Sequence, residues 1–134
     1  MAAKYFVDEN DLALGKLLAH EHPEVVYPGH PDLPEVPRGT LDDAWLPVIG
    51  GRRLVVITRD QRIRYRTVEK RAWVEHRVRG FVLTGRRSQS TSDSRAVLDR
   101  HWNRMTGLID AEPAGPWMYA VTEAGLREIR LAGH

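Results

Sequence analysis

Short apolar segments alternate with helix-like segments along this chain, and that alternation constrains the fold more than any other feature of its sequence. The most informative segment is Leu54–Thr58 (LVVIT), which is almost continuously apolar and β-branched, as a strand buried on both faces should be. Further strands are predicted at Lys4–Val7, Glu24–Tyr27, Gly80–Thr84, Trp117–Val121 and Leu126–Leu131. Because helical segments separate most of these strands, the sequence predicts an α/β fold with a mostly parallel sheet covered on both faces.

Four segments between the strands have the character of helices. They begin near Asn10 or Asp11, near Thr40 or Asp42, at residue 67 and at residue 93. A loop rich in proline and glycine, residues 28–39, precedes the second helix, and Gly50 and Gly51 end it. No repeat or linker divides the 134 residues, so we expect a single domain over residues 1–134.

The composition excludes several kinds of site. The absence of cysteine rules out disulfides, thiolate zinc sites and cysteine nucleophiles. The spacing of His20, His22 and His30 favours surface positions over zinc binding. No apolar run approaches the roughly 20 residues that span a bilayer, and the N-terminus lacks a signal peptide pattern. The chain is therefore expected in the cytoplasm, without a membrane partner.

Charge is divided unevenly along the sequence. Residues 1–51 carry a net charge of −6, whereas residues 52–134 carry +8, which together give the overall +2. An acidic patch beside a basic surface suits a site that binds cations and a polyanion together, although chance clustering of surface charge is the simpler alternative.

Acidic residues follow two of the predicted strands at the point where each strand ends. Asp8 and Glu9 come directly after Lys4–Val7, and Asp60 follows Leu54–Thr58 after one intervening residue. Ligands of parallel α/β sheets bind beyond the carboxyl ends of the strands. We therefore expect Asp8 and Asp60 to lie at one edge of the sheet.

Asp42 and Asp43 begin the helix that precedes the third strand, and they reach the same edge only if the preceding loop carries them there. Carboxylates that converge repel one another unless a cation offsets their charge, and oxygen ligands indicate Mg²⁺ or Mn²⁺ rather than zinc. Such an ion can activate water for attack on a phosphodiester. The alternative is that Asp42 and Asp43 are helix caps and that Asp60 forms a turn.

An arginine-rich segment, TRDQRIRYRTVEKR, includes the end of the third strand and the residues that follow it. Guanidinium groups match the geometry of phosphates, so Arg59, Arg62 and Arg64 are candidate substrate-binding residues. For Lys70 and Arg71 a solvated helix surface is the preferred interpretation.

Three segments, FVDEN, LDDAWLPVIGG and LVVITRDQRIRYR, together resemble the PIN-like domain of VapC-type toxins. Two later segments, VRGFVLTG and GPWMYAVTEAGLREI, are similar to the C-terminal half of the smaller branch of that family. The resemblance implies a three-layer α/β/α domain and an Mg²⁺- or Mn²⁺-dependent endoribonuclease. It further implies the toxin of a type II toxin–antitoxin module, a homodimer that is inhibited by a cognate antitoxin protein.

Matched by position, the resemblance assigns Asp8, Asp42 and Asp60 as the catalytic and metal-binding acids, with Glu9 and Asp43 as second choices. No later acid matches the fourth acid that the family often has, and Asp93 is the nearest candidate. Hydrolysis of RNA by water that the metal activates is the mechanism implied. The alternatives are cleavage of other RNA or DNA, a non-catalytic module that binds nucleic acid or protein, and a small-molecule phosphatase.

Overall fold

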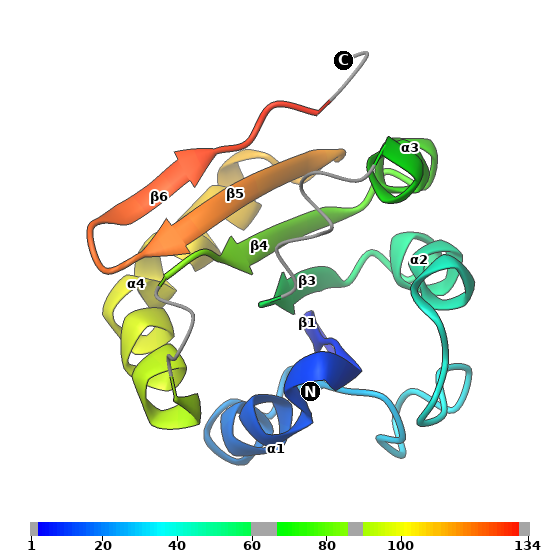
Figure 1. Ribbon diagram of the computed structural model, residues 1–134, viewed down its shortest axis with the longest axis horizontal. Helices are drawn as coiled ribbons and strands as arrows, with labels where there is room; N and C mark the ends of the chain where they lie inside the picture. Colours follow the sequence, from blue (N-terminus) through cyan, green and yellow to red (C-terminus); the bar gives the residue numbers. More distant parts are fainter. Residues whose placement is uncertain (1–2, 60–66, 86–89, 132–134) are drawn as a thin grey trace.

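The computed structural model describes residues 3–59, 67–85 and 90–131. In this part of the chain six strands form one sheet, in the order β2-β1-β3-β4-β5-β6 (Figure 1). The first five strands are parallel, and β6 pairs antiparallel with β5. The strands are β1 (Tyr5–Val7), β2 (Val25–Val26), β3 (Val55–Thr58), β4 (Arg79–Leu83), β5 (Trp117–Thr122) and β6 (Gly125–Glu128).

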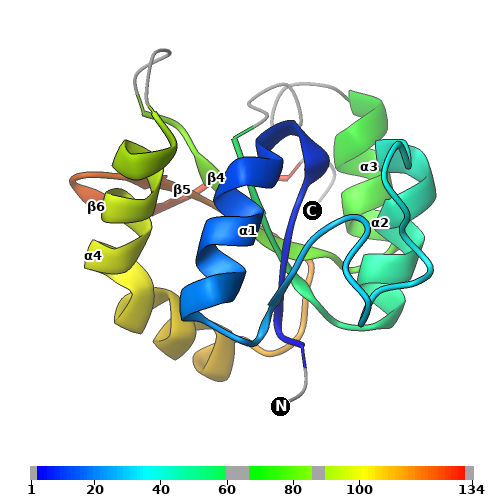
Figure 2. The same ribbon diagram turned by 90° about the horizontal axis from the view of Figure 1, so that it is seen from below.

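The helices cover both faces of this sheet. They are η1 (Glu9–Asp11), α1 (Leu12–Glu21), α2 (Asp42–Gly51), α3 (Thr67–Glu75) and α4 (Thr91–Ala111). Figures 1 and 2 show α1 with α4 on one face and α2 with α3 on the other. The predicted three-layer α/β/α arrangement with a mostly parallel sheet is therefore confirmed. Within the described ranges, no helix combines the length and the apolar character needed to cross a membrane.

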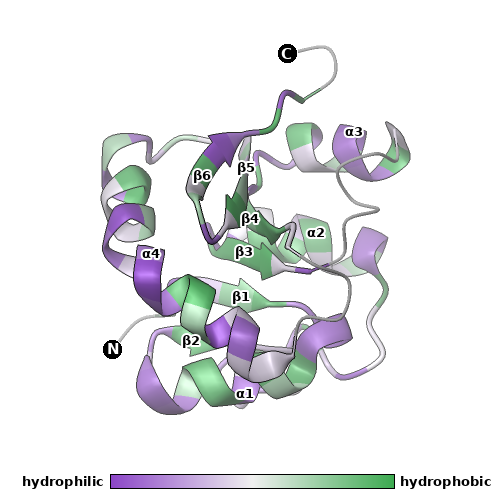
Figure 3. Ribbon diagram, turned by 60° about the vertical axis from the view of Figure 1, so that its left-hand side comes forward, coloured by the Kyte–Doolittle hydropathy of each residue, from purple (hydrophilic) through white to green (hydrophobic). Residues whose placement is uncertain are grey.

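The alternation of side chains along each strand produces two separate cores. In β1, Tyr5 and Val7 pack against the α1 and α4 side, whereas Phe6 packs against the α2 and α3 side. Val55 and Ile57 of β3 likewise face α1 and α4. Figure 3 shows these central strands as mostly hydrophobic ribbon between helices that also carry hydrophilic segments. Burial on both faces explains why the central strands have no polar alternation.

The connection between β4 and β5 has the opposite hand to the three before it. The hand of a crossover follows from the face on which its helix lies and from the direction in which the chain moves to the next strand. The β1–α1–β2 unit moves one way with its helix on one face, and the β2–α2–β3 and β3–α3–β4 units move the other way with their helices on the other face, so all three have the same hand. From β4 to β5 the chain moves along the sheet in the same direction as from β3 to β4, but α4 lies on the face of α1 rather than that of α3. Since parallel crossovers are right-handed in about 98% of cases, the α4 crossover is the exceptional one.

The last predicted strand differs from the structure at its end. It was expected over Leu126–Leu131, but β6 ends at Glu128, although the backbone N–H of Ile129 still donates a hydrogen bond to the carbonyl of Met118. The side chains of Ile129 and Leu131 pack into the α2 and α3 core. Asp11 is the N-cap residue of α1, which therefore begins where it was expected.

The candidate fourth acid has a structural role in α4. The Ser90 hydroxyl accepts a hydrogen bond from the backbone N–H of Asp93, and the Asp93 carboxylate accepts one from the backbone N–H of Ser90. This reciprocal pair is a capping box, which accounts for Asp93 without any part in chemistry.

Candidate functional site

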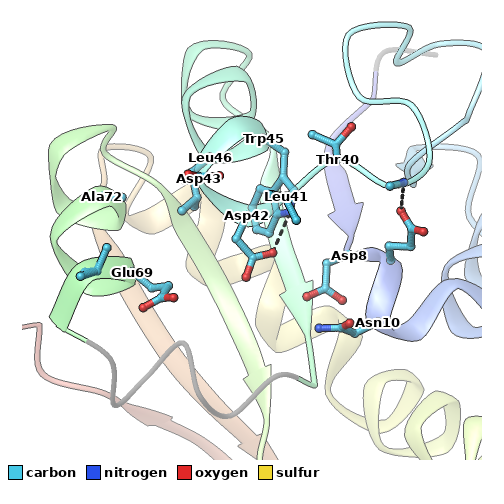
Figure 4. Close-up of a pocket in the computed structure, with 13 residues that line it drawn as sticks. Asp8, Asn10, Thr40, Leu41, Asp42, Asp43, Trp45, Leu46, Glu69 and Ala72 are labelled. Carbon is cyan, nitrogen blue, oxygen red and sulfur yellow. Dashed lines mark hydrogen bonds between the residues drawn. The ribbon is translucent and has the colours of Figure 1, made fainter.

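A cleft of about 490 Å³ lies at the carboxyl ends of β1 and β3. The chain leaves β1 toward β2 by way of α1, and it leaves β3 toward β4 by way of α3 on the opposite face, so the two connections diverge between β1 and β3. Such a divergence is where open parallel sheets bind ligands. The cleft is bounded by the residues after β1, the loop before α2 and the first turns of α2 and α3 (Figure 4).

Asp8 forms the floor of the cleft. Only 2% of its surface is exposed, and its Oδ2 accepts a hydrogen bond from the Thr58 hydroxyl at 2.5 Å. Thr58 is the last residue of β3, so this bond joins the ends of β1 and β3 across the divergence. A buried carboxylate is held in one orientation by such a bond, because leaving its polar atoms unsatisfied would cost free energy.

Asp42 reaches the same cleft from the other side. It is the first residue of α2, and its Oδ1 accepts a hydrogen bond from Nε1 of the buried Trp45 at 3.0 Å. Figure 4 shows the carboxylates of Asp8 and Asp42 both pointing into the cavity. Asp42 is not the N-cap residue of α2, since Leu41 holds that position.

A hydrogen bond fixes the loop before α2 to the residues that directly follow β1. The backbone N–H of Gly39 donates to Oε1 of Glu9 at 2.5 Å, and Gly39 adopts a φ of +89° that suits glycine. This contact explains how the loop carries the start of α2 to the edge of the sheet. Glu9, a second-choice acid in the sequence, therefore anchors the loop as well as lining the cleft.

Glu69 is an acid of the cleft that sequence reasoning missed. It lies in the first turn of α3, is half-buried, and points toward the cavity from the side opposite Asp8 (Figure 4). The position of Glu69 in the sequence could have revealed it, because the helix after a parallel strand begins at the carboxyl edge of the sheet, where ligands bind. An acid in the first turn of that helix was therefore a candidate from the sequence alone.

Every charged side chain among the described residues that line the cleft is acidic. The carboxylates that line it are Asp8, Glu9, Asp42, Asp43 and Glu69, and no Lys, Arg or His is among its lining residues. All-oxygen donors of this kind fit Mg²⁺ or Mn²⁺. Among the described residues, however, no three His, Asp or Glu side chains are close enough together to hold one ion. Asp43 is exposed at the rim, so Asp42 is the better-placed acid of that pair.

Asp60, Arg62 and Arg64 lie outside the described residues. Arg59 is described, and its Nη1 lies 3.5 Å from Oδ2 of Asp11, a carboxylate that is 7% exposed. Burial raises the pKa of Asp11, whereas the charge and hydrogen bond of Arg59 lower it. This ion pair was not expected, and it gives Arg59 a structural partner in addition to the predicted phosphate contact.

Replacing Arg59 with methionine is expected to lower the free energy of unfolding by roughly 1–3 kcal/mol at pH 7, because Asp11 stays charged without its cation. The pKa of Asp11 should rise further in this variant. The folded state then holds the Asp11 proton more tightly than the unfolded state, so stability should fall as pH rises above the ordinary value of 3.8. Urea denaturation at several pH values measures this effect.

The double variant Arg59→Met with Asp11→Asn is the control, and it should recover most of the lost stability. An equal loss at pH 3 and pH 7 would show that packing of the arginine, rather than the ion pair, is responsible.

The three histidines considered from the sequence, His20, His22 and His30, do not line the acidic cleft. His22 stacks on Trp102 with ring centroids 4.1 Å apart, and each of its ring nitrogens lies 3.9 Å from a carboxylate oxygen, of Glu24 and of Asp99. His20 is exposed, and His30 contacts Tyr27 in the proline loop. These surroundings agree with structural and surface positions.

Comparison with known proteins identifies one family. The family described as "PIN like domain" matches residues 3–85, which include β1 to β4, Asp8, Asp42 and Glu69. No match was found among curated proteins or among solved structures. The matched region covers more than half of the chain and contains the whole acidic cleft, and the chain therefore belongs to the PIN-like domain family.

Proposed function

We propose that this protein is a metal-dependent endoribonuclease. PIN-like domains are generally nucleases, and such nucleases usually use divalent metal ions. The observation that carries the proposal is that Asp8 and Asp42, far apart in sequence, line one cleft in which no described lining residue is basic. We assign Asp8, Asp42 and Asp60 as the catalytic acids, and we add Glu69 as a fourth.

The protein's own groups prepare this cleft before any ion or substrate arrives. The Thr58 hydroxyl fixes the carboxylate of Asp8, and the indole N–H of Trp45 fixes that of Asp42. Acids held in place this way lose little further freedom on binding a cation. When bound, Mg²⁺ or Mn²⁺ would favour ionisation of a water molecule and stabilise the negative charge that develops on the phosphodiester.

Substrate would approach over an apolar rim and a basic segment. Leu41 and Val68 line the cleft and are 72% and 75% exposed, so they can contact nucleobases beside the acids. We assign Arg62 and Arg64 to flanking phosphates, as guanidinium chemistry favours. Arg59 contributes less to this role because it already pairs with Asp11.

The finer assignment rests on the sequence resemblance to VapC-type toxins. On that basis we propose the toxin component of a type II toxin–antitoxin module, active in the cytoplasm as a homodimer. A cognate antitoxin would inhibit it by covering the acidic cleft. Co-expression with the product of an adjacent reading frame, followed by co-purification, tests this part separately from the chemistry.

The catalytic proposal predicts that the protein cleaves single-stranded RNA in Mg²⁺ and that a chelator abolishes the cleavage. The experiment incubates the purified protein with RNA and with DNA of the same sequence, in Mg²⁺, in Mn²⁺ and in EDTA. Cleavage of DNA alone would replace the proposal with a deoxyribonuclease. Binding of RNA with no cleavage in either metal would instead indicate a non-catalytic binding module.

A further inference from the structure

A second cavity, of about 520 Å³, lies at the opposite edge of the sheet from the acidic cleft. It is formed where α2 ends, where β3 and β4 begin, and where the chain passes from α4 to β5. In Figure 2 this edge is the lower one, whereas η1, which follows Asp8, lies at the upper edge. Among the described residues its charged lining is mostly basic, with Arg53, Arg77 and Arg79 against one acid, Glu75.

Arg79 is the central residue of this cavity. It is the first residue of β4, a strand inside the sheet, and only 8% of its surface is exposed. Its Nη2 donates a hydrogen bond to the backbone carbonyl of Arg53 at 2.7 Å. No carboxylate of the described chain lies within 4.0 Å of its guanidinium. A buried cation without an anion is unfavourable, and burial together with the charge of Arg53 lowers the pKa of Arg79.

The cavity walls are closely packed backbone. A Cβ atom on Gly115 would lie 2.3 Å from the carbonyl oxygen of Arg77 and 2.9 Å from Cγ of Arg79. A Cβ atom on Gly50 would lie 2.3 Å from the carbonyl oxygen of His76. Glycine at these two positions lets the chain approach closely enough to hold the arginines around one space.

Two of the three arginines occupy an unusual backbone conformation. Arg53 and Arg77 have φ values of 57° and 54°, in the left-handed region that glycine and asparagine adopt more readily than arginine. Arginine at both positions is therefore not explained by the turns themselves. Their charge at this cavity is the property that glycine or asparagine would lack.

We propose that this cavity is a binding site for a phosphate group. A buried guanidinium that lines the cavity and donates to a carbonyl, flanked by two exposed arginines, matches the charge and hydrogen-bonding chemistry of a phosphate. The site lies at the other edge of the sheet from the acids and does not depend on the nuclease proposal. The phosphate belongs either to a free ion or small nucleotide, or to an RNA chain.

The test measures binding of inorganic phosphate by calorimetry, in a phosphate-free buffer with EDTA. The wild-type protein should bind phosphate saturably, and Arg79→Met should weaken binding about tenfold or more. Arg77→Asn should also weaken it, and this variant keeps a residue that tolerates the positive φ, so folding is preserved. The matched control is Lys16→Gln, which removes one exposed charge on α1, away from the cavity, and should leave the affinity unchanged.

The source of the phosphate is decided by competition in the same buffer. An RNA oligonucleotide that displaces inorganic phosphate, and does so less well with Arg77→Asn, identifies the RNA chain as the ligand. Displacement by a mononucleotide but not by RNA identifies a small ligand. Absence of saturable phosphate binding, or an equal loss of affinity in Lys16→Gln, overturns the proposal. Because EDTA is present throughout, failure of metal-dependent cleavage has no bearing on this result.

Discussion

Replacing Asp8 with asparagine is expected to lower Mg²⁺-dependent RNA cleavage by more than about 100-fold. Even residues that only hydrogen-bond to a metal ligand lower metal affinity or activity about 10–100-fold when they are replaced, and a ligand itself should matter more. The amide keeps the shape of the side chain but loses the negative charge that would attract the cation. Its oxygen can still accept the hydrogen bond from Thr58 that Asp8 accepts in the structure. Initial cleavage rates at saturating Mg²⁺, with thermal unfolding of the same preparation, measure the effect.

The matched control is Asp32→Asn, which makes the same chemical change on an exposed side chain of the proline loop. Its cleavage rate should equal that of the wild type. If Asp8→Asn retains a rate within tenfold of the wild type while its melting temperature is unchanged, Asp8 does not hold the metal and the site assignment is wrong.

Replacing Trp73 with alanine is expected to lower the free energy of unfolding by about 3–5 kcal/mol, the usual range for removing a large buried aromatic side chain. Trp73 is fully buried in the α2 and α3 core, and its Nε1 donates a hydrogen bond to the carbonyl of Trp117 at 3.0 Å. It also fills the space above Gly80, where a Cβ atom would lie 2.7 Å from the indole ring. Urea denaturation measures the loss.

Trp102→Ala provides the comparison, because Trp102 is only half-buried and stacks on His22 at the edge of the other core. Its loss of stability should be clearly smaller. Equal losses in the two variants would mean that the core between the sheet and α3 is less tightly packed than the structure shows.

The parts of the fold that depend on local sequence could be predicted. The strands around Phe6 and Val56 were recognised because their apolar side chains are buried on both faces, a property visible in a few consecutive residues. Asp8 could be placed at the carboxyl edge for the same reason, since its position follows directly from the strand before it. The helices that begin at Asp42 and Thr67 were also predicted within two residues.

The parts that depend on contacts between distant residues could not be predicted. The place of Asp42 in the cleft depends on the hydrogen bond from Gly39 to Glu9, which no local pattern reveals. The pair of Arg59 with Asp11 is likewise a tertiary contact between two separate turns. A right-handed crossover between β4 and β5 would place α4 on the face of α2 and α3, but α4 lies on the face of α1. The general rule for parallel crossovers would therefore have predicted the wrong face.

The cleft is shared between two layers of the fold, and this has a consequence for control of the proposed activity. Asp8 directly follows strand β1 of the sheet, whereas Asp42 and Glu69 are carried by the adjoining helices α2 and α3. Sliding of that helical layer by a fraction of a helical turn would change the separation of the acids without breaking either core. Side chains that hold the layer in register, such as Ile49 and Trp73, would therefore influence the metal affinity that the proposed function requires. A ligand or partner that displaced α2 and α3 from their outer surface would in this way alter the proposed activity without entering the cleft.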